Sequence, residues 1–169
     1  MIRYLRSLAL TCAMLAVFPL HAAGPAPLPP VEVFHPPVCL ACIDWAEHLR
    51  ENGFTVRMTP TPDMAALKQR LKVPADVESV HTATVAGYFV EGHVPAEDIK
   101  QLLLEKPKAR GIAVPGLPAG APGRQVQTPF CDTACTIIDG TTSEREPRRE
   151  MFNTLLIDSR GNSSVFARH

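Results

Sequence analysis

The stretch VEVFHPPVCLACIDWAEHLRENG, residues 31–53, predicts a short strand, a turn and an amphipathic helix. The strand is indicated by its β-branched and aromatic residues. Pro36 and Pro37 end it, because proline has no backbone N–H for a ladder. Gly53 predicts the end of the helix. The helix itself is indicated by apolar residues at i, i+3, i+4 and i+7, namely Cys42, Trp45, Ala46 and Leu49.

Cys39 and Cys42 form a C-x-x-C pair at the predicted N-terminus of this helix. The positive end of the helix dipole favours thiolate, the form that attacks disulfides and binds soft metal ions. The spacing alone does not choose between thiol–disulfide chemistry and metal binding, so both remain open.

The first 23 residues predict a secretory signal peptide. Arg3 and Arg6 precede an apolar run at residues 8–20, and small residues follow as far as Gly24. We expect cleavage near Ala23, which also removes Cys12, and a periplasmic location for the remaining protein. No other run is long and apolar enough to span a membrane.

The charge of the chain excludes two classes of partner. The sequence holds 17 basic and 17 acidic residues, and cleavage removes two arginines, which leaves 15 basic residues and a net charge of −2. Neither nucleic acid nor an anionic membrane surface is attracted to such a chain. The length suits one domain with a sizeable core.

Four cysteines remain after cleavage: Cys39, Cys42, Cys131 and Cys135. An oxidising compartment favours disulfides, and three pairings of four cysteines are possible. If residues 131–135 are helical, Cys131 and Cys135 share one face. They would then either form a local disulfide or complete a four-thiol site with the first pair.

The rest of the N-terminal part predicts a thioredoxin-like, glutaredoxin-type α/β core at residues 31–107, preceded by a proline-rich leader at 24–30. The elements expected after residue 53 are a strand at 54–59, a helix capped by Asp63, a β-hairpin at 81–91 and a helix that starts at Pro95. Thioredoxin-type oxidoreductases carry a cis-proline just before the third strand. Residues 79–82 contain no proline, which disfavours an oxidoreductase.

The C-terminal part predicts a strap and a hairpin. Residues 108–127 are rich in proline and glycine, and we expect GIAVPGLPAGAPG at 111–123 to be neither helix nor central strand. Residues 128–169 hold the second cysteine pair and two strand-like segments, 153–157 and 164–167. These segments predict a terminal β-hairpin that packs on the core.

Several motifs together resemble the periplasmic CopG-like copper-binding family, formerly catalogued as a domain of unknown function. They are P-x-C-x-x-C-x-x-W-x-x-H-L at 37–49, GF at 53–54, S-x-H-T-A at 79–83, G-Y-x-x-E-G-H-V-P at 87–95 and P-G-x-P-x-G-x-P-G at 115–123. The match runs from about residue 31 to 123, with a weaker echo after Phe152. The resemblance implies a thioredoxin-like fold, a periplasmic location and copper resistance through Cu(I) held by clustered cysteines.

The chain departs from this family at the ligands. Ala41 and Val80 stand where the resemblance implies cysteines, and Leu117 and Arg124 where it implies methionines. Two cysteines are too few to bridge a multi-copper cluster, but one Cu(I) on Cys39 and Cys42 remains feasible.

Two histidines are weaker candidate ligands beside the second cysteine pair. His81 follows a lost cysteine position, and His93 either faces the site or caps the following helix. His48 and Trp45 are expected to be structural, and Glu91 has no acidic partner at motif spacing. Zinc is a possible alternative metal.

Three hypotheses follow. The favoured one is a non-enzymatic protein of copper homeostasis that captures Cu(I) through Cys39 and Cys42, with a third ligand from His81 or the second cysteine pair. It would exchange copper with another periplasmic copper-handling protein. The second is a thiol–disulfide oxidoreductase in which Cys39 attacks and Cys42 resolves. The third is a degenerate family member with structural disulfides, no metal and a protein partner.

Overall fold

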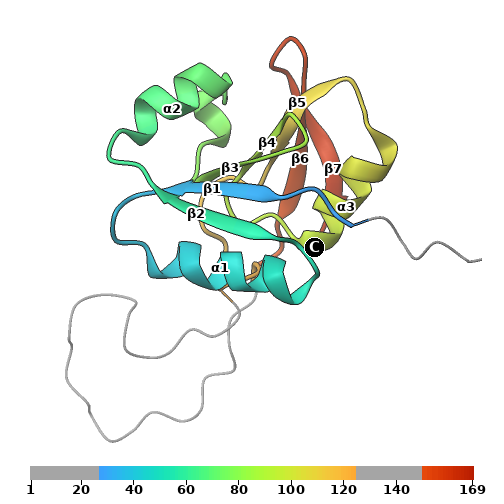
Figure 1. The fold of residues 1–169 in the computed structure, drawn as a ribbon. Helices are drawn as coiled ribbons and strands as arrows, with labels where there is room; N and C mark the ends of the chain where they lie inside the picture. Colours follow the sequence, from blue (N-terminus) through green and yellow to red (C-terminus); the bar gives the residue numbers. More distant parts are fainter. Residues whose placement is uncertain (1–26, 125–149) are drawn as a thin grey trace, which may run out of the picture.

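Seven strands form one mixed sheet in the computed structural model, which describes residues 27–124 and 150–169 (Figure 1). The strand order is β2-β1-β3-β4-β5-β6-β7. The elements in chain order are β1 (Val31–His35), α1 (Leu40–Glu51), β2 (Val56–Pro60), α2 (Met64–Leu71), a 3₁₀ turn (Ala75–Val77), β3 (Thr82–Val85), β4 (Tyr88–Glu91), α3 (Ala96–Glu105), β5 (Ala109–Ala113), β6 (Asn153–Asp158) and β7 (Ser163–Arg168). The predicted mixture of helices and strands is therefore confirmed.

The strand pairings combine both directions. β1 is parallel to β2 and antiparallel to β3, β3 and β4 form a tight antiparallel hairpin, and β4 is parallel to β5. The crossovers are made by α1, between β1 and β2, and by α3, between β4 and β5. Strands that run in parallel need such long connections, and helices commonly supply them.

Alternating side chains divide the core between the two faces of the sheet. Val90 and its neighbour Phe89 point to opposite faces and belong to different buried clusters. On one face, α1 and α3 pack through Trp45, Leu49, Ile99 and Leu102. On the other face, the smaller cluster includes Val73 and Val77, which follow α2, and α2 lies across the sheet from α1 (Figure 1).

Strand β5 corrects one prediction. We expected no central strand within residues 111–123, yet β5 lies between β4 and β6 and includes residues 111–113. Gly111 by itself predicts a loop, but here it allows close packing of two strands. A Cβ at this position would collide with the Phe89 carbonyl oxygen and lie 2.7 Å from Phe89 Cγ. Ile112, Ala113 and Val114 are fully buried, so apolar burial outweighs the weak strand propensity of glycine.

The predicted terminal hairpin is confirmed by β6 and β7, which extend the sheet. Asp158 shapes its turn by accepting hydrogen bonds from Asn162 and from the backbone N–H of Arg160, and these donors hold the pKa of Asp158 well below its usual value. The hairpin is fastened to α3 because buried Asp98 accepts a hydrogen bond from Thr154 and lies 2.9 Å from His169 Nε2.

The remaining predictions about the ends and the second cysteine pair lie outside the described residues. These are the signal peptide at 1–23, most of the leader at 24–30, and the segment that contains Cys131 and Cys135. Among the described residues, no helix has both the length and the hydrophobicity needed to cross a membrane.

Replacing Gly111 with alanine tests the close approach of β5 to β4. We expect Gly111→Ala to lower the free energy of unfolding by about 2–3 kcal/mol, because the new methyl group meets backbone that cannot move without breaking the ladder. Gly116→Ala is the matched control: its φ of +68° penalises alanine by about 1 kcal/mol, but no atom lies within 4 Å of the added Cβ. Urea unfolding measures both, and equal losses would contradict the close-approach argument.

Candidate functional site

Cys39 and Cys42 lie together at the start of α1, joined by a disulfide with a Cα–Cα distance of 5.3 Å. Cys39 is the N-cap of the helix, and its Sγ accepts a hydrogen bond from the Cys42 backbone N–H at 3.3 Å. Cys39 is half-buried and Cys42 is fully buried. One sulfur therefore faces the surface and the other faces the core.

The helix N-terminus gives this pair its chemistry. The first turn of α1 carries no acidic side chain, so nothing there offsets the positive end of the helix dipole. Reduction of the disulfide would place the Cys39 sulfur at this end with a backbone N–H directed at it, which favours thiolate. Metal binding by the pair requires this reduction, because thiolates rather than disulfide sulfurs are the ligands.

Trp45 lies one turn below the cysteines and is fully buried, as expected for a core residue. Its Nε1–H donates a hydrogen bond to the Val94 carbonyl at 2.8 Å. Its ring lies 4.4 Å from the ring of His81, and His81 in turn lies 4.9 Å from His93 in an edge-on arrangement. The structure thus brings both predicted histidines into one buried stack beneath the first turn of α1.

His81 is the most isolated of these imidazoles. Neither of its ring nitrogens has a hydrogen-bond partner of acceptable geometry. Burial, reinforced by the neighbouring His93 and Lys68, holds the pKa of His81 well below its usual value, while the Gly92 backbone acts weakly in the opposite direction. His81 is therefore a neutral imidazole with unused nitrogen lone-pair capacity.

His93 is held in a defined tautomer. Its Nδ1–H donates to the Pro122 carbonyl at 2.7 Å, and its Nε2 has no partner. Burial lowers the pKa of His93 as well. His93 does not cap α3: His48 does so, because its Nε2 accepts a hydrogen bond from the Ala96 backbone N–H at 3.1 Å. The structural role expected for His48 is thereby explained.

His35 is a member of this region that the sequence analysis missed. It is buried at the end of β1, its Nδ1–H donates to the Pro36 carbonyl at 2.7 Å, and its Nε2 is unpartnered. It is close enough to His81 to influence the pKa of that ring. The available signal was strand parity, since Val31, Val33 and His35 alternate onto the same buried face.

A buried ion pair fixes the loop that carries His81. Glu91 pairs with Lys68 and accepts hydrogen bonds from the Ser79 backbone N–H at 2.6 Å and the Thr82 hydroxyl at 2.5 Å. Burial raises the pKa of Glu91, and these donors oppose that shift. Because both ends of residues 79–82 are tied to one carboxylate, the position of His81 between them is set by the fold.

The described residues contain no group of three or more His, Cys, Asp or Glu side chains arranged to hold a metal ion. The histidines therefore lie near one another without forming a ligand set in this oxidised arrangement. Cys131 and Cys135, the other candidate ligands, lie outside the described residues.

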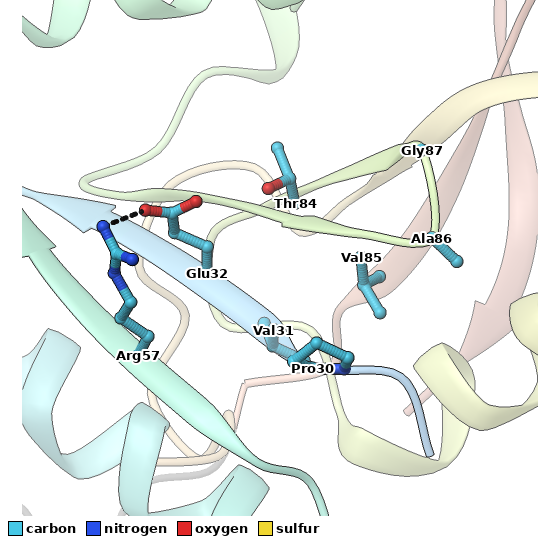
Figure 2. Close-up of a pocket in the computed structure, with 8 residues that line it drawn as sticks. All are labelled: Pro30, Val31, Glu32, Arg57, Thr84, Val85, Ala86 and Gly87. Atoms are coloured by element: carbon cyan, nitrogen blue, oxygen red, sulfur yellow. Dashed lines mark ion pairs between the residues drawn. The ribbon is translucent and has the colours of Figure 1, made fainter. Parts of the chain in front are cut away.

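A hollow in the surface lies at the other end of the sheet. It has a volume of about 400 Å³ and is lined by the start of β1 and the turn between β3 and β4 (Figure 2). Glu32 and Arg57 form an ion pair of 3.3 Å on its wall, and Thr59 also donates to Glu32. These polar groups are satisfied by each other, so the hollow offers no reactive group comparable to the cysteine pair.

Comparison with known proteins finds a family match and two similar solved structures. Residues 77–124 match a family described as "Protein of unknown function, DUF411". No curated protein matches the chain. A solved structure of copper resistance protein copG, form 1, is 34% identical over 84% of this chain and 98% of its own, with a TM-score of 0.69. Form 2 is 35% identical over 85% and 99%, with a TM-score of 0.70.

The buried histidines predict loss of stability in acid. In the unfolded chain they bind protons below pH about 6.5, whereas the lowered pKa values of His81, His93 and His48 keep the folded protein from binding them. The free energy of unfolding of the metal-free protein should therefore fall between pH 7 and pH 5. His81→Phe should reduce that slope by up to about 1.4 kcal/mol per pH unit.

Urea unfolding at several pH values measures this effect. At pH 7.5 we expect His81→Phe to stay within about 1 kcal/mol of the wild type, because no hydrogen bond is lost. His93→Phe, the control, should lose about 1–2 kcal/mol with its bond to Pro122. A His81→Phe profile parallel to that of the wild type would refute the assignment of acid sensitivity to His81.

Proposed function

Because the chain belongs to the CopG-like copper-resistance family, we propose that it handles copper by binding Cu(I) through the reduced sulfurs of Cys39 and Cys42. The observation that carries this proposal is the placement of both sulfurs within bonding distance at the N-terminus of α1, where thiolate is favoured. Soft thiolates select Cu(I), and the half-buried Cys39 leaves one of the two sulfurs accessible to an incoming ion.

Two further parts of the proposal concern fold and location. We infer a thioredoxin-like core, supported by the order β2-β1-β3-β4 with β1 parallel to β2 and antiparallel to β3. We infer a periplasmic location, supported by the signal-like pattern of residues 1–23. There the protein would pass copper to or from another periplasmic copper-handling protein.

The third ligand is proposed to be His81, with His93 and the second cysteine pair as alternatives. His81 is supported by its unpartnered ring nitrogens and its contact with Trp45, one turn from Cys42. Zinc is the less suitable metal because it requires four ligands in a tetrahedron. Cys39 and Cys42 supply two, so a zinc site would need two more ligands from the histidines or from Cys131 and Cys135.

A second candidate function is thiol–disulfide exchange. It is favoured by the asymmetry of the bridge, since accessible Cys39 suits an attacking sulfur and buried Cys42 a resolving one. Thioredoxin-type oxidoreductases carry a proline just before β3. This chain has His81 at that position, which argues against thiol–disulfide exchange as the function. A purely structural disulfide with a protein partner is the third candidate.

Cu(I) titration of the fully reduced protein against a chromophoric chelator tests the main proposal. Cys39→Ser and Cys42→Ser should each weaken Cu(I) binding by at least about tenfold, because one of two thiolates is lost. The Cys131→Ser/Cys135→Ser double variant is the matched control and should retain binding through the first pair. Unchanged affinity in Cys39→Ser would overturn the assignment.

Insulin reduction by the protein in the presence of dithiothreitol separates the two chemistries. If copper binding is the function, the rate should not exceed that of dithiothreitol alone, and Cys39→Ser should leave it unchanged. A faster rate that Cys39→Ser abolishes would instead favour the second candidate.

A further inference from the structure

Exposed apolar residues adjoin both cysteines of the disulfide in the sequence. Val38 and Leu40 flank Cys39 and are 87% and 72% exposed, and Ile43, which follows Cys42, is 52% exposed. Large apolar side chains clustered on a surface commonly mark a place where another molecule binds. A molecule bound to a cluster beside the disulfide would lie next to that bond.

Val80 extends this apolar rim from a different element. The antiparallel pairing of β1 and β3 ends at Phe34 and Thr82, so Val80, just before β3, and the turn that leads from β1 to Cys39 lie at the same end of the two strands. Val80 is 37% exposed. In the described part of the chain, neither its N–H nor its carbonyl takes part in a hydrogen bond. These free groups suit pairing with an extended peptide.

We propose that this rim, formed by Val38, Leu40, Ile43 and Val80, docks an extended apolar segment of a protein dithiol, which reduces the Cys39–Cys42 disulfide. The inference rests on the proposed function, because Cu(I) binding needs both sulfurs as thiolates. A reaction of the thiol–disulfide exchange class must therefore precede copper capture. Four side chains expose far less than the roughly 1,000 Å² of a stable interface, and a short-lived redox encounter fits this size.

The step balances as two successive exchanges. A thiolate of the partner attacks Sγ of Cys39, the more accessible sulfur, and the Cys39–Cys42 bond breaks. Cys42 leaves with the electron pair and takes up a proton. The partner's second thiolate then attacks the partner's own sulfur in the mixed disulfide, and Cys39 leaves as a thiolate stabilised by the Cys42 N–H. Two electrons pass from the partner dithiol to this chain.

The proposal can be tested with two synthetic C-x-x-C peptides as reductants. One carries valine and leucine beside the cysteines, and the other carries serine there. Reduction of the disulfide can be followed by the fluorescence of Trp45, the single tryptophan, with Cys131 and Cys135 replaced by serine in every protein. The apolar peptide should react about tenfold faster than the serine peptide, since docking buries apolar surface only with the first. Glutathione, which cannot occupy the rim, provides the reference rate.

Variants assign the preference to the rim. Leu40→Ser and Val80→Ser should reduce the rate ratio of the two peptides toward one and leave the glutathione rate unchanged. Leu104→Ser is the matched control, because Leu104 is 83% exposed on α3 and should not alter the ratio. Equal rates for the two peptides, or a ratio that Leu40→Ser leaves intact, would overturn the proposal.

Two further readouts complete the test. If sizing shows a dimer that Leu40→Ser dissociates, and the peptide preference is absent, a second copy covers the rim and the proposal fails. Cu(I) titration after chemical reduction does not involve docking. Loss of the preference with intact copper binding therefore refutes only the docking surface, and intact preference without copper binding refutes only the proposed function.

Discussion

The packing of Trp45 determines how α1 is seated on the sheet, and with it the position of the cysteines. Its Nε1–H is fixed on the Val94 carbonyl and its ring contacts His81. The strap approaches the same residue so closely that a Cβ on Gly123 would lie 2.7 Å from the Trp45 backbone nitrogen. Segments before β3, after β4 and at the end of the strap therefore converge on one side chain, and the disulfide lies one turn above it.

Periodicity made most of the fold predictable. The apolar stripe of α1, the cap at Asp63 and both hairpins follow from spacings of 3.6 and 2 residues and from local turn chemistry. The central position of β5 was not predictable in this way. Its glycine is explained by Phe89, which is distant in the sequence, so the property that makes Gly111 suitable appears only when β4 and β5 are side by side.

In the candidate site too, local spacing predicts some features and tertiary contacts determine the others. The spacing of Cys39 and Cys42 identified them as a pair, because the first turn of a helix brings residues i and i+3 together. The proximity of His81, His93 and His35 depends instead on tertiary contacts between β1, the loop before β3 and the segment after β4. A single histidine at a strand end carries no motif, and strand parity alone could place His35 in the core without naming its neighbours.

The replacement of an expected cysteine by Val80 changes the surface near the disulfide as well as the set of possible ligands. Val80 stands where the resemblance implies a cysteine, and its side chain is one of the four exposed apolar ones in the proposed docking rim. The replacement therefore removes a thiolate and adds apolar surface at the same point, beside backbone groups that take part in no hydrogen bond among the described residues. Under the proposed function, fewer sulfurs would limit the site to a single soft ion. If the rim docks a protein dithiol as we propose, a more apolar rim makes the redox state of the remaining pair accessible to that partner. Copper capture would then depend on recognition of the partner as well as on the ligands.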